Sequence, residues 1–191
     1  MSQHLKEHIE KFIEINDEEF AAVLPFFKSL RAAKKEDLLS AGQICRFNYF
    51  VVKGCLRMFF LNSKGAEQTV QFAIENWWIA DYLSFDNRTR SEFSIQAVEE
   101  SEILAIDYES QERMLHRYPK LERYFRLIHQ KAHSASQSRI KFLYDLSRED
   151  LYRHFCNNYP QFVQRIPQYL LASYLGFTPE YLSEIRRKKE W

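Results

Sequence analysis

The period of the hydrophobic positions changes twice along the chain. Two amphipathic helical patterns come first, one within residues 5–13 and one within residues 16–27. From about residue 29 to residue 107 the pattern changes to short runs that are rich in β-branched and aromatic side chains. The helical period then returns and continues to the end of the chain.

The central runs predict an antiparallel β-structure. They are separated by local turn signals such as Lys53-Gly54 and the stretch from Asn62 to Gly65. Short strands at this spacing are typical of a barrel or roll and not of alternating βαβ units. We expect strands at residues 30–33, 37–40, 47–52, 56–61, 69–74, 93–98 and 103–106.

A long helix is predicted between Leu121 and Leu146. Apolar or small residues recur there at intervals of four and three, with Ala132 and Ala135 near the middle. Small side chains let a second, identical helix approach closely, so we interpret this heptad seam as the interface of a two-fold dimer. The alternative is a long helix that packs on its own domain.

The segment from residue 167 to residue 190 has the pattern of a helix-turn-helix. Pro167 suits the first turn of one helix, and Gly176 can adopt the left-handed conformation that ends it. Thr178 then supplies an N-cap for a second helix, in which Leu182 and Ile185 form the buried stripe.

The exposed side of that second helix is the candidate DNA-binding surface. In a helix-turn-helix the start of the second helix reads base edges in the major groove, and basic residues contact phosphates. Glu180 would accept a hydrogen bond from a cytosine amino group, and Arg187 would donate one to guanine or phosphate. The predicted DNA-binding residues are Thr178, Glu180, Tyr181, Ser183, Glu184, Arg186, Arg187 and Lys188.

Charge supports this interpretation, although the whole chain carries a net charge of only +1. Residues 1–115 contain 13 Lys and Arg against 19 Asp and Glu, whereas residues 116–191 contain 14 against 7. The basic half therefore favours a polyanionic partner.

Compartment and redox state follow from the remaining composition. The N-terminus is charged where a secretory signal would be apolar, and no run is long enough for a membrane span, so we expect a cytoplasmic protein without membrane contact. Cys45, Cys55 and Cys156 lack metal-site spacing, which favours reduced, buried thiols.

With the β-rich region, the long helix and the terminal motif from Leu171 to Arg186, the chain resembles the short, wingless members of the Crp/Fnr family of transcriptional regulators. The resemblance implies an α+β fold. Its parts would be an N-terminal antiparallel β-roll of the cyclic-nucleotide-binding type (a double-stranded β-helix) in residues 1–115, a central dimerisation helix in 116–146 and a helix-turn-helix in 147–191. It also implies a homodimer on a pseudo-palindromic double-stranded DNA site, with RNA polymerase as a further partner.

Two departures from the family change the expected DNA recognition. The best-known recognition helices carry an arginine on each side of the glutamate that Glu180 matches, whereas Pro179 and Glu184 hold those places here. The sequence also ends at Trp191, before the usual β-hairpin wing. We therefore expect a different target sequence, and backbone contacts from another part of the chain.

The phosphate cassette of the nucleotide-binding members is also altered. Ala80-Asp81 replaces the Gly-Glu pair, and Ser91 with Glu92 stands where the phosphate arginine is expected. We therefore expect no usual response to cyclic AMP and no cofactor, although Arg88 and Arg90 leave a nucleotide open as an alternative. The predicted pocket for an unidentified small-molecule effector comprises Trp77, Trp78, Asp81, Arg88 and Arg90; core packing is the alternative for the tryptophans.

Other functional classes have less support in the sequence. A cupin-like enzyme needs a His-x-His motif in the β-rich region, and no histidine lies between His8 and His116. His129 and His133 share a helix face, but no third ligand is near in sequence, so we expect no metal site. The remaining alternative is an interaction or small-molecule-sensing module whose helix-turn-helix no longer binds DNA.

Overall fold

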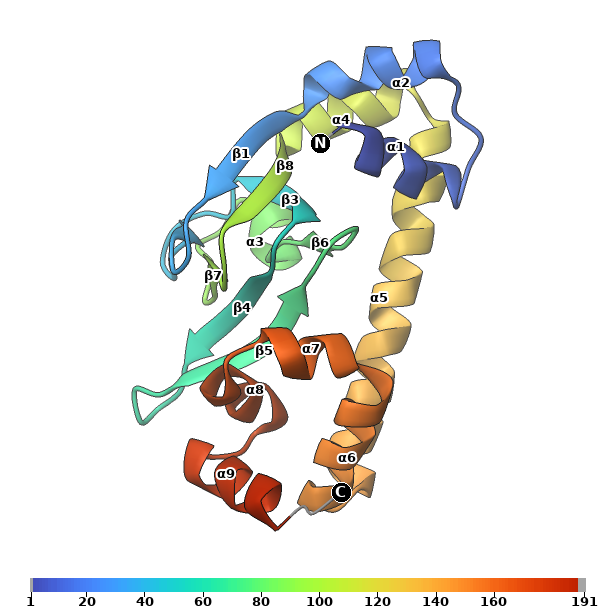
Figure 1. Cartoon of the computed structure of the whole chain (residues 1–191). Coiled ribbons are helices and arrows are strands. Elements are labelled where there is room, and N and C mark those ends of the chain that lie inside the picture. Colours follow the sequence, from blue (N-terminus) through green and yellow to red (C-terminus); the bar gives the residue numbers. More distant parts are fainter. Residues whose placement is uncertain (1, 189–191) are drawn as a thin grey trace. The chain divides into compact units, whose positions relative to one another are not determined.

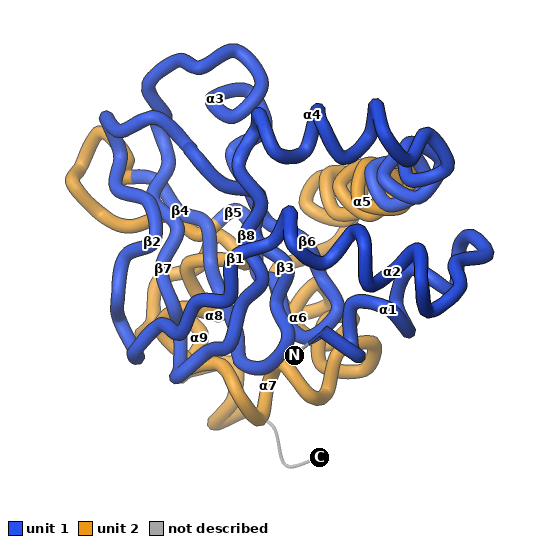
Figure 2. The backbone as a smooth tube through the Cα atoms, turned by 90° about the horizontal axis from the view of Figure 1, so that it is seen from above, with its two compact units in different colours: residues 1–60, 70–129 blue, residues 61–69, 130–191 orange. Residues whose placement is uncertain are grey.

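The computed structural model describes residues 2–188 and divides into two compact units. The first contains residues 1–60 and 70–129, and the second contains residues 61–69 and 130–191. Figure 2 shows that the long helix α5 (Lys120–Asp145) contributes to both units. Each unit is described by itself below.

The first unit is built on an antiparallel β-roll (Figure 1). Four strands form one sheet in the order β1-β8-β3-β6, and four form the other in the order β2-β7-β4-β5. The strands are β1 (Lys28–Ala32), β2 (Asp37–Leu39), β3 (Phe47–Lys53), β4 (Leu56–Leu61), β5 (Glu67–Ala73), β6 (Trp78–Ile79), β7 (Ser94–Ala97) and β8 (Ser101–Asp107).

Strand alternation gives this unit two hydrophobic cores. On β3, Tyr49 and Val51 belong to the core inside the roll, whereas Phe50 and Val52 belong to a second core on the other side of the same sheet. Successive side chains of a strand point to opposite faces, so β3 is buried on both sides. This explains why residues 49–52 are continuously apolar instead of alternating.

Helices contribute to the second core. Leu5 and Ile9 of one helix and Leu121 of α5 join Phe50 and Trp78 there. Asn16 caps a further helix in a capping box with Glu19. The helical segments of this unit besides α5 are α1 (Ser2–Glu10), α2 (Asp17–Val23), the short 3₁₀ helix η1 (Leu24–Phe26), α3 (Tyr82–Asn87) and α4 (Tyr108–Arg117).

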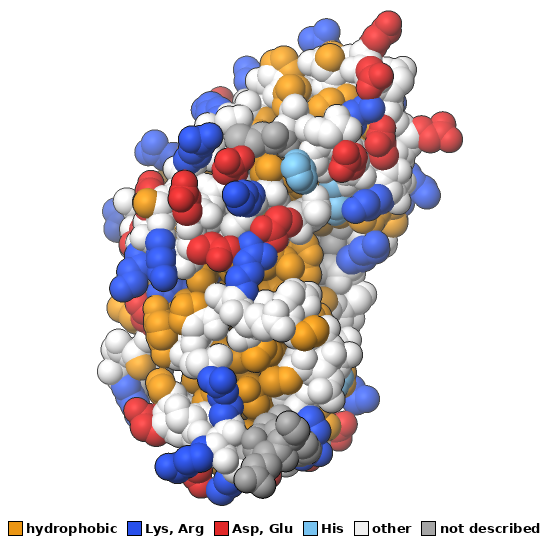
Figure 3. Space-filling model, in the orientation of Figure 1, with side chains coloured by type: hydrophobic (Ala, Val, Ile, Leu, Met, Phe, Trp, Pro, Cys, Tyr) orange, Lys and Arg blue, Asp and Glu red, His pale blue; other side chains and the backbone are white. Residues whose placement is uncertain are grey.

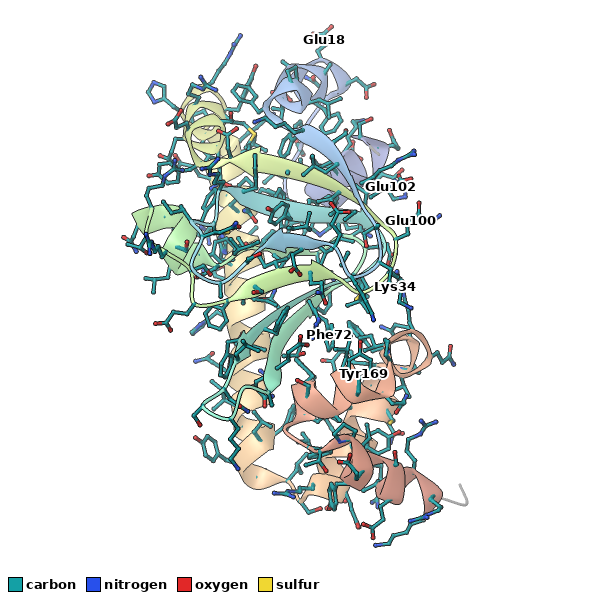
Figure 4. All side chains as sticks on the ribbon, turned by 90° about the vertical axis from the view of Figure 1, so that its left-hand side faces the viewer. Glu18, Lys34, Phe72, Glu100, Glu102 and Tyr169 are labelled. Atoms are coloured by element: carbon teal, nitrogen blue, oxygen red, sulfur yellow. The ribbon has the colours of Figure 1, made fainter. Side chains whose placement is uncertain are left out.

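Charged side chains remain at the outer edge of the roll. Glu102 on β8 is paired across the sheet with Arg31 on β1, with 3.9 Å between their charged groups. Figure 4 shows Glu100 and Glu102 projecting outward from the sheet near Lys34. These charged side chains thus lie outside the two apolar cores.

The described part of the second unit is helical apart from short connections and residues 61–69, which include the end of β4 and the start of β5. Tyr152 and Phe155 on one helix, with Phe162 and Leu171, are among its buried residues. Its helices after α5 are α6 (Arg148–Asn158), α7 (Pro160–Arg165), α8 (Gln168–Leu175) and α9 (Pro179–Arg187). Because α6 to α9 follow one another after short connections, the predicted continuous helical region is confirmed.

The structure corrects the interpretation of the heptad seam. The long helix itself is confirmed. Leu121 and Phe125, however, are buried in the core of their own domain, so these two residues pack as the alternative interpretation predicted. Further along, Arg139 donates a 2.7 Å hydrogen bond to the Tyr174 carbonyl oxygen and lies over that ring. Only the middle of the seam, at Ala132 and Ala135, is exposed.

Candidate nucleic-acid interface

Helices α8 and α9 form the predicted helix-turn-helix. Leu171 and Ala172 are fully buried on α8. Gly176 ends this helix in the left-handed conformation, at φ 76°, and its N–H donates to the carbonyl oxygens of Ala172 and Ser173. A residue with a Cβ would be strained at this φ, so the glycine defines the turn.

The second helix begins at the predicted N-cap. The Thr178 hydroxyl accepts a 3.2 Å hydrogen bond from the Tyr181 N–H, and Pro179 occupies the first helical position. Leu182 and Ile185 are buried, as expected from the apolar stripe. This burial turns the opposite face of α9 toward solvent.

The predicted DNA-binding residues mostly lie on that solvent face. Figure 3 shows basic and acidic side chains mixed over the surface of this part of the chain. Tyr181 and Glu184 are half-buried. The exposed members of the set are Thr178, Glu180, Ser183, Arg186, Arg187 and Lys188.

One basic residue of α9 already has an acidic partner. Lys188 Nζ lies 2.7 Å from a Glu184 carboxylate oxygen, one helical turn away. The hydrogen bond in this pair raises the pKa of Lys188 and lowers the pKa of Glu184. Phosphate binding by Lys188 would therefore compete with an existing ion pair.

Tyr181 contacts two other residues at the start of α9. Its ring packs edge to face on Phe177, with 5.6 Å between ring centroids. The guanidinium carbon of Arg148, from the first turn of α6, lies 5.4 Å from the Tyr181 ring centroid. Sequence reasoning missed Arg148 because it precedes the motif, and no local pattern shows which helix it will face.

The residues that replace the nucleotide cassette bind each other. Asp81 is buried and caps α3: one carboxylate oxygen accepts from the Ser84 N–H at 3.4 Å, and the other accepts from the Ser91 hydroxyl at 2.7 Å. The positions aligned with the glutamate and the arginine of the cassette are thus joined by an internal hydrogen bond. A ribose or phosphate group at Asp81 would have to displace Ser91.

The other predicted effector residues differ in their burial and contacts. Trp78 is 5% exposed and packs in the core beside the helices, as the alternative of core packing predicted. Trp77, in contrast, is 44% exposed. Arg88 has a left-handed backbone, with φ 57°, and its guanidinium lies over the Tyr108 ring at 5.5 Å. Arg90 is exposed and forms an isolated β-bridge.

The interior of the roll is closely packed next to the altered cassette. Phe85 of α3 and Ile95 of β7 are fully buried there. Burial also raises the pKa of the Cys45 thiol to about 11, which keeps it protonated and unreactive. An open pocket of about 540 Å³ lies instead beside β2, lined by Leu30 and by residues between 37 and 49; none of the five predicted effector residues lines it.

No cluster of three or more potential metal ligands occurs within residues 2–188. His129 instead packs edge to face on Tyr82, with ring centroids 4.7 Å apart. In the same part of the chain, none of the helices is both long enough and apolar enough to cross a membrane.

Comparisons with known proteins agree with this geometry. Residues 29–118 match the family model described as "Cyclic nucleotide-binding domain". A solved structure of a CooA mutant from Carboxydothermus hydrogenoformans superposes with a TM-score of 0.71 at 17% identity, over 93% of this chain and 85% of that one. The chain has the fold of the Crp/Fnr regulators.

Two further solved structures support this assignment. The c-di-GMP-responsive global regulator CLP of Xanthomonas campestris has a TM-score of 0.71 at 16% identity, over 88% of this chain and 90% of that one. A protein from Eubacterium rectale assigned to the Crp/Fnr family has a TM-score of 0.69 at 16% identity, over 91% of this chain and 83% of that one. No curated protein matches the sequence. The predicted resemblance to Crp/Fnr regulators is thereby confirmed for the domain and the fold.

Proposed function

We propose that this chain is a homodimeric transcriptional regulator that binds a pseudo-palindromic DNA site through α9. The observation that carries the proposal is the geometry of α8 and α9. Gly176 forms the turn and Thr178 caps the second helix, while Leu182 and Ile185 anchor it and leave Glu180 exposed. A helix anchored in this way can insert its opposite face into the major groove.

The proposed dimer uses a face of α5 that differs from the predicted seam. Ile140, Leu143 and Tyr144 are 55%, 41% and 89% exposed. His133 and Ser136 precede them at helical spacing and are also exposed. In this stripe, the apolar residues at its C-terminal end could pack against a second copy of the chain, and the small Ser136 would let the two helices approach closely.

The proposed regulator contains a sensor in residues 1–115, a dimerisation helix in 116–146 and a DNA-binding domain in 147–191. The hydrogen bond between Asp81 and Ser91 supports an effector other than cyclic AMP or no effector at all, because it occupies the cassette. Action on transcription from the cytoplasm, with RNA polymerase as a partner, is part of the same proposal.

The alternative is an interaction module that does not bind DNA. Two acidic residues of the exposed helix, Glu180 and Glu184, favour this alternative, since carboxylates repel phosphates. A cupin-like enzyme has no corresponding support, because the matched family and the solved structures above are regulatory.

Selection from a random duplex library tests the proposal against the interaction module. We expect enrichment of a palindromic motif with half-sites about one helical turn apart, since paired α9 helices would meet one face of the duplex. Sedimentation of the protein with the selected duplex should give two chains per duplex. A library that yields no enriched motif, from protein with the far-ultraviolet spectrum of a folded α+β chain, would favour the interaction module.

A further inference from the structure

A cation from outside the helix-turn-helix lies beside the start of the recognition helix. Arg148 is the first residue of α6, directly after the N-cap Ser147. Its guanidinium carbon lies 5.4 Å from the centroid of the Tyr181 ring in the first turn of α9. The side chain itself is exposed.

Contacts with the two residues Phe177 and Thr178 hold Tyr181 in place at the start of α9. Phe177 packs against it edge to face, and the Tyr181 N–H is bound to the Thr178 cap. On a helix with 3.6 residues per turn, Tyr181 lies on the flank, between the buried Leu182 side and the exposed Glu180 side. The ring is therefore placed to hold a neighbouring cation and not to point along the base-reading face.

The flank of a recognition helix meets the DNA backbone. A helix with its side chains is about 10–12 Å across, and the major groove is about 12 Å wide. A helix that enters the groove fills it, so a group against the flank of its first turn faces the rows of phosphates at the groove edge.

The charges around Arg148 leave it available for such a contact. Glu149 and Asp150 are the acids of the same turn, and Asp150 already accepts from the Ser147 hydroxyl at 2.6 Å and pairs with Arg153 at 3.2 Å. Within residues 2–188 no ion pair of Arg148 is formed, whereas Lys188 on α9 is paired with Glu184.

We propose that Arg148 binds a DNA backbone phosphate at the edge of the groove that α9 enters, and that Tyr181 is a positioning residue for this guanidinium. The planar guanidinium can stack on an aromatic ring and still donate two parallel hydrogen bonds to a phosphate, which a lysine ammonium cannot do. This inference rests on the proposed DNA binding and assigns two of its residues.

Salt-dependent binding of Arg148→Gln tests the phosphate contact. Fluorescence anisotropy with the selected duplex and with a scrambled duplex should show a loss of about tenfold on both, because a phosphate contact carries no sequence information. The slope of log K against log salt concentration should fall by about 0.9 for the one contact. Arg123→Gln, an exposed position on α5 of the first unit, is the matched control for the same change in net charge and should bind within about twofold of the wild type.

Two substitutions at Tyr181 test its role. Tyr181→Phe keeps the ring and should leave affinity and base preference unchanged, whereas a base-reading hydroxyl would make this variant change base preference. Tyr181→Leu removes the ring face and should lower affinity as much as Arg148→Gln, with no further loss in the double variant. Thermal unfolding of each variant checks that the helix-turn-helix remains folded.

The outcomes separate this inference from the proposed function. If the wild-type chain binds no duplex, both are wrong. If the wild type binds and Arg148→Gln binds with the same affinity and salt slope, or if Tyr181→Phe alters base preference, only the inference is overturned.

Discussion

The Tyr124 hydroxyl oxygen lies 2.8 Å from Nδ1 of His8, and the two residues are 116 positions apart in the chain. The same hydroxyl accepts a 2.8 Å hydrogen bond from the indole N–H of Trp78. The hydroxyl also forms the hydrogen bond with His8 Nδ1, in which the tautomer of His8 decides which group donates. One buried hydroxyl thus joins α1, β6 and α5.

Tyr124→Phe should destabilise the chain because it removes that shared partner from two buried groups. We expect a loss of about 1–3 kcal/mol in the free energy of unfolding, measured by urea denaturation. Tyr169→Phe is the matched control, since Tyr169 is exposed, and should change the free energy by less than about 0.5 kcal/mol. Equal effects of the two substitutions would show that the Tyr124 hydrogen bonds do not contribute.

Stability should depend on pH through His129. Burial lowers the pKa of His129 from its ordinary value of 6.5, while Asp86 partly opposes this effect. The unfolded chain therefore binds the proton more readily, so the folded state should lose stability as the pH falls through and below 6.5. Urea denaturation at pH 7.5 and at pH 5.5 measures the loss.

His129→Gln should make that loss smaller by removing the titrating group. Burial raises the pKa of the Asp86 carboxyl group, so the folded chain binds that proton more readily and Asp86 acts in the opposite direction to His129. An unchanged difference between the two pH values in the variant would exclude His129 as the cause.

The exposed stripe of α5 should form the dimer. Ile140→Asp places a charge in the proposed apolar interface and should give a folded monomer in sedimentation at micromolar concentration. Leu61→Asp, at another exposed apolar residue, is the control and should remain a dimer. A dimer that survives Ile140→Asp would exclude this face of α5.

Cyclic AMP should not bind tightly. The Ser91 hydroxyl occupies an oxygen of Asp81, and the interior of the roll beside it is filled by Phe85. Calorimetric titration should show no binding at micromolar concentration. Micromolar affinity that is lost in Arg88→Ala or Arg90→Ala would show that the cassette is aligned wrongly and that a loop arginine binds the phosphate.

Local sequence signals predicted the helix-turn-helix because its determinants are close in sequence. Gly176, Thr178 and the buried Leu182 each act within a few residues, through backbone conformation, capping and helical periodicity. Seven of the strands were found for the same reason, since β4 lies at the predicted residues 56–61 and the other six predicted strands differ from expectation only at their ends.

Contacts between distant segments could not be predicted in this way. The two-residue strand β6 and the helix α3 carry too few residues to show a period, so they were missed. The heptad seam was a correct sign of a helix, but periodicity does not identify the partner, and Leu121 packs on its own domain. The stacking of Arg148 on Tyr181 likewise depends on how α6 meets α9.

Base preference of the Glu180→Ala variant is the most direct test of DNA recognition by α9. Selection from the same random duplex library should show that one base position in each half-site loses its preference. Affinity for the wild-type site should fall by about 1–3 kcal/mol, the usual contribution of one good base contact, and Arg123→Gln should reproduce the wild-type motif. A motif and an affinity that are both indifferent to Glu180 would contradict base reading by the exposed face of α9.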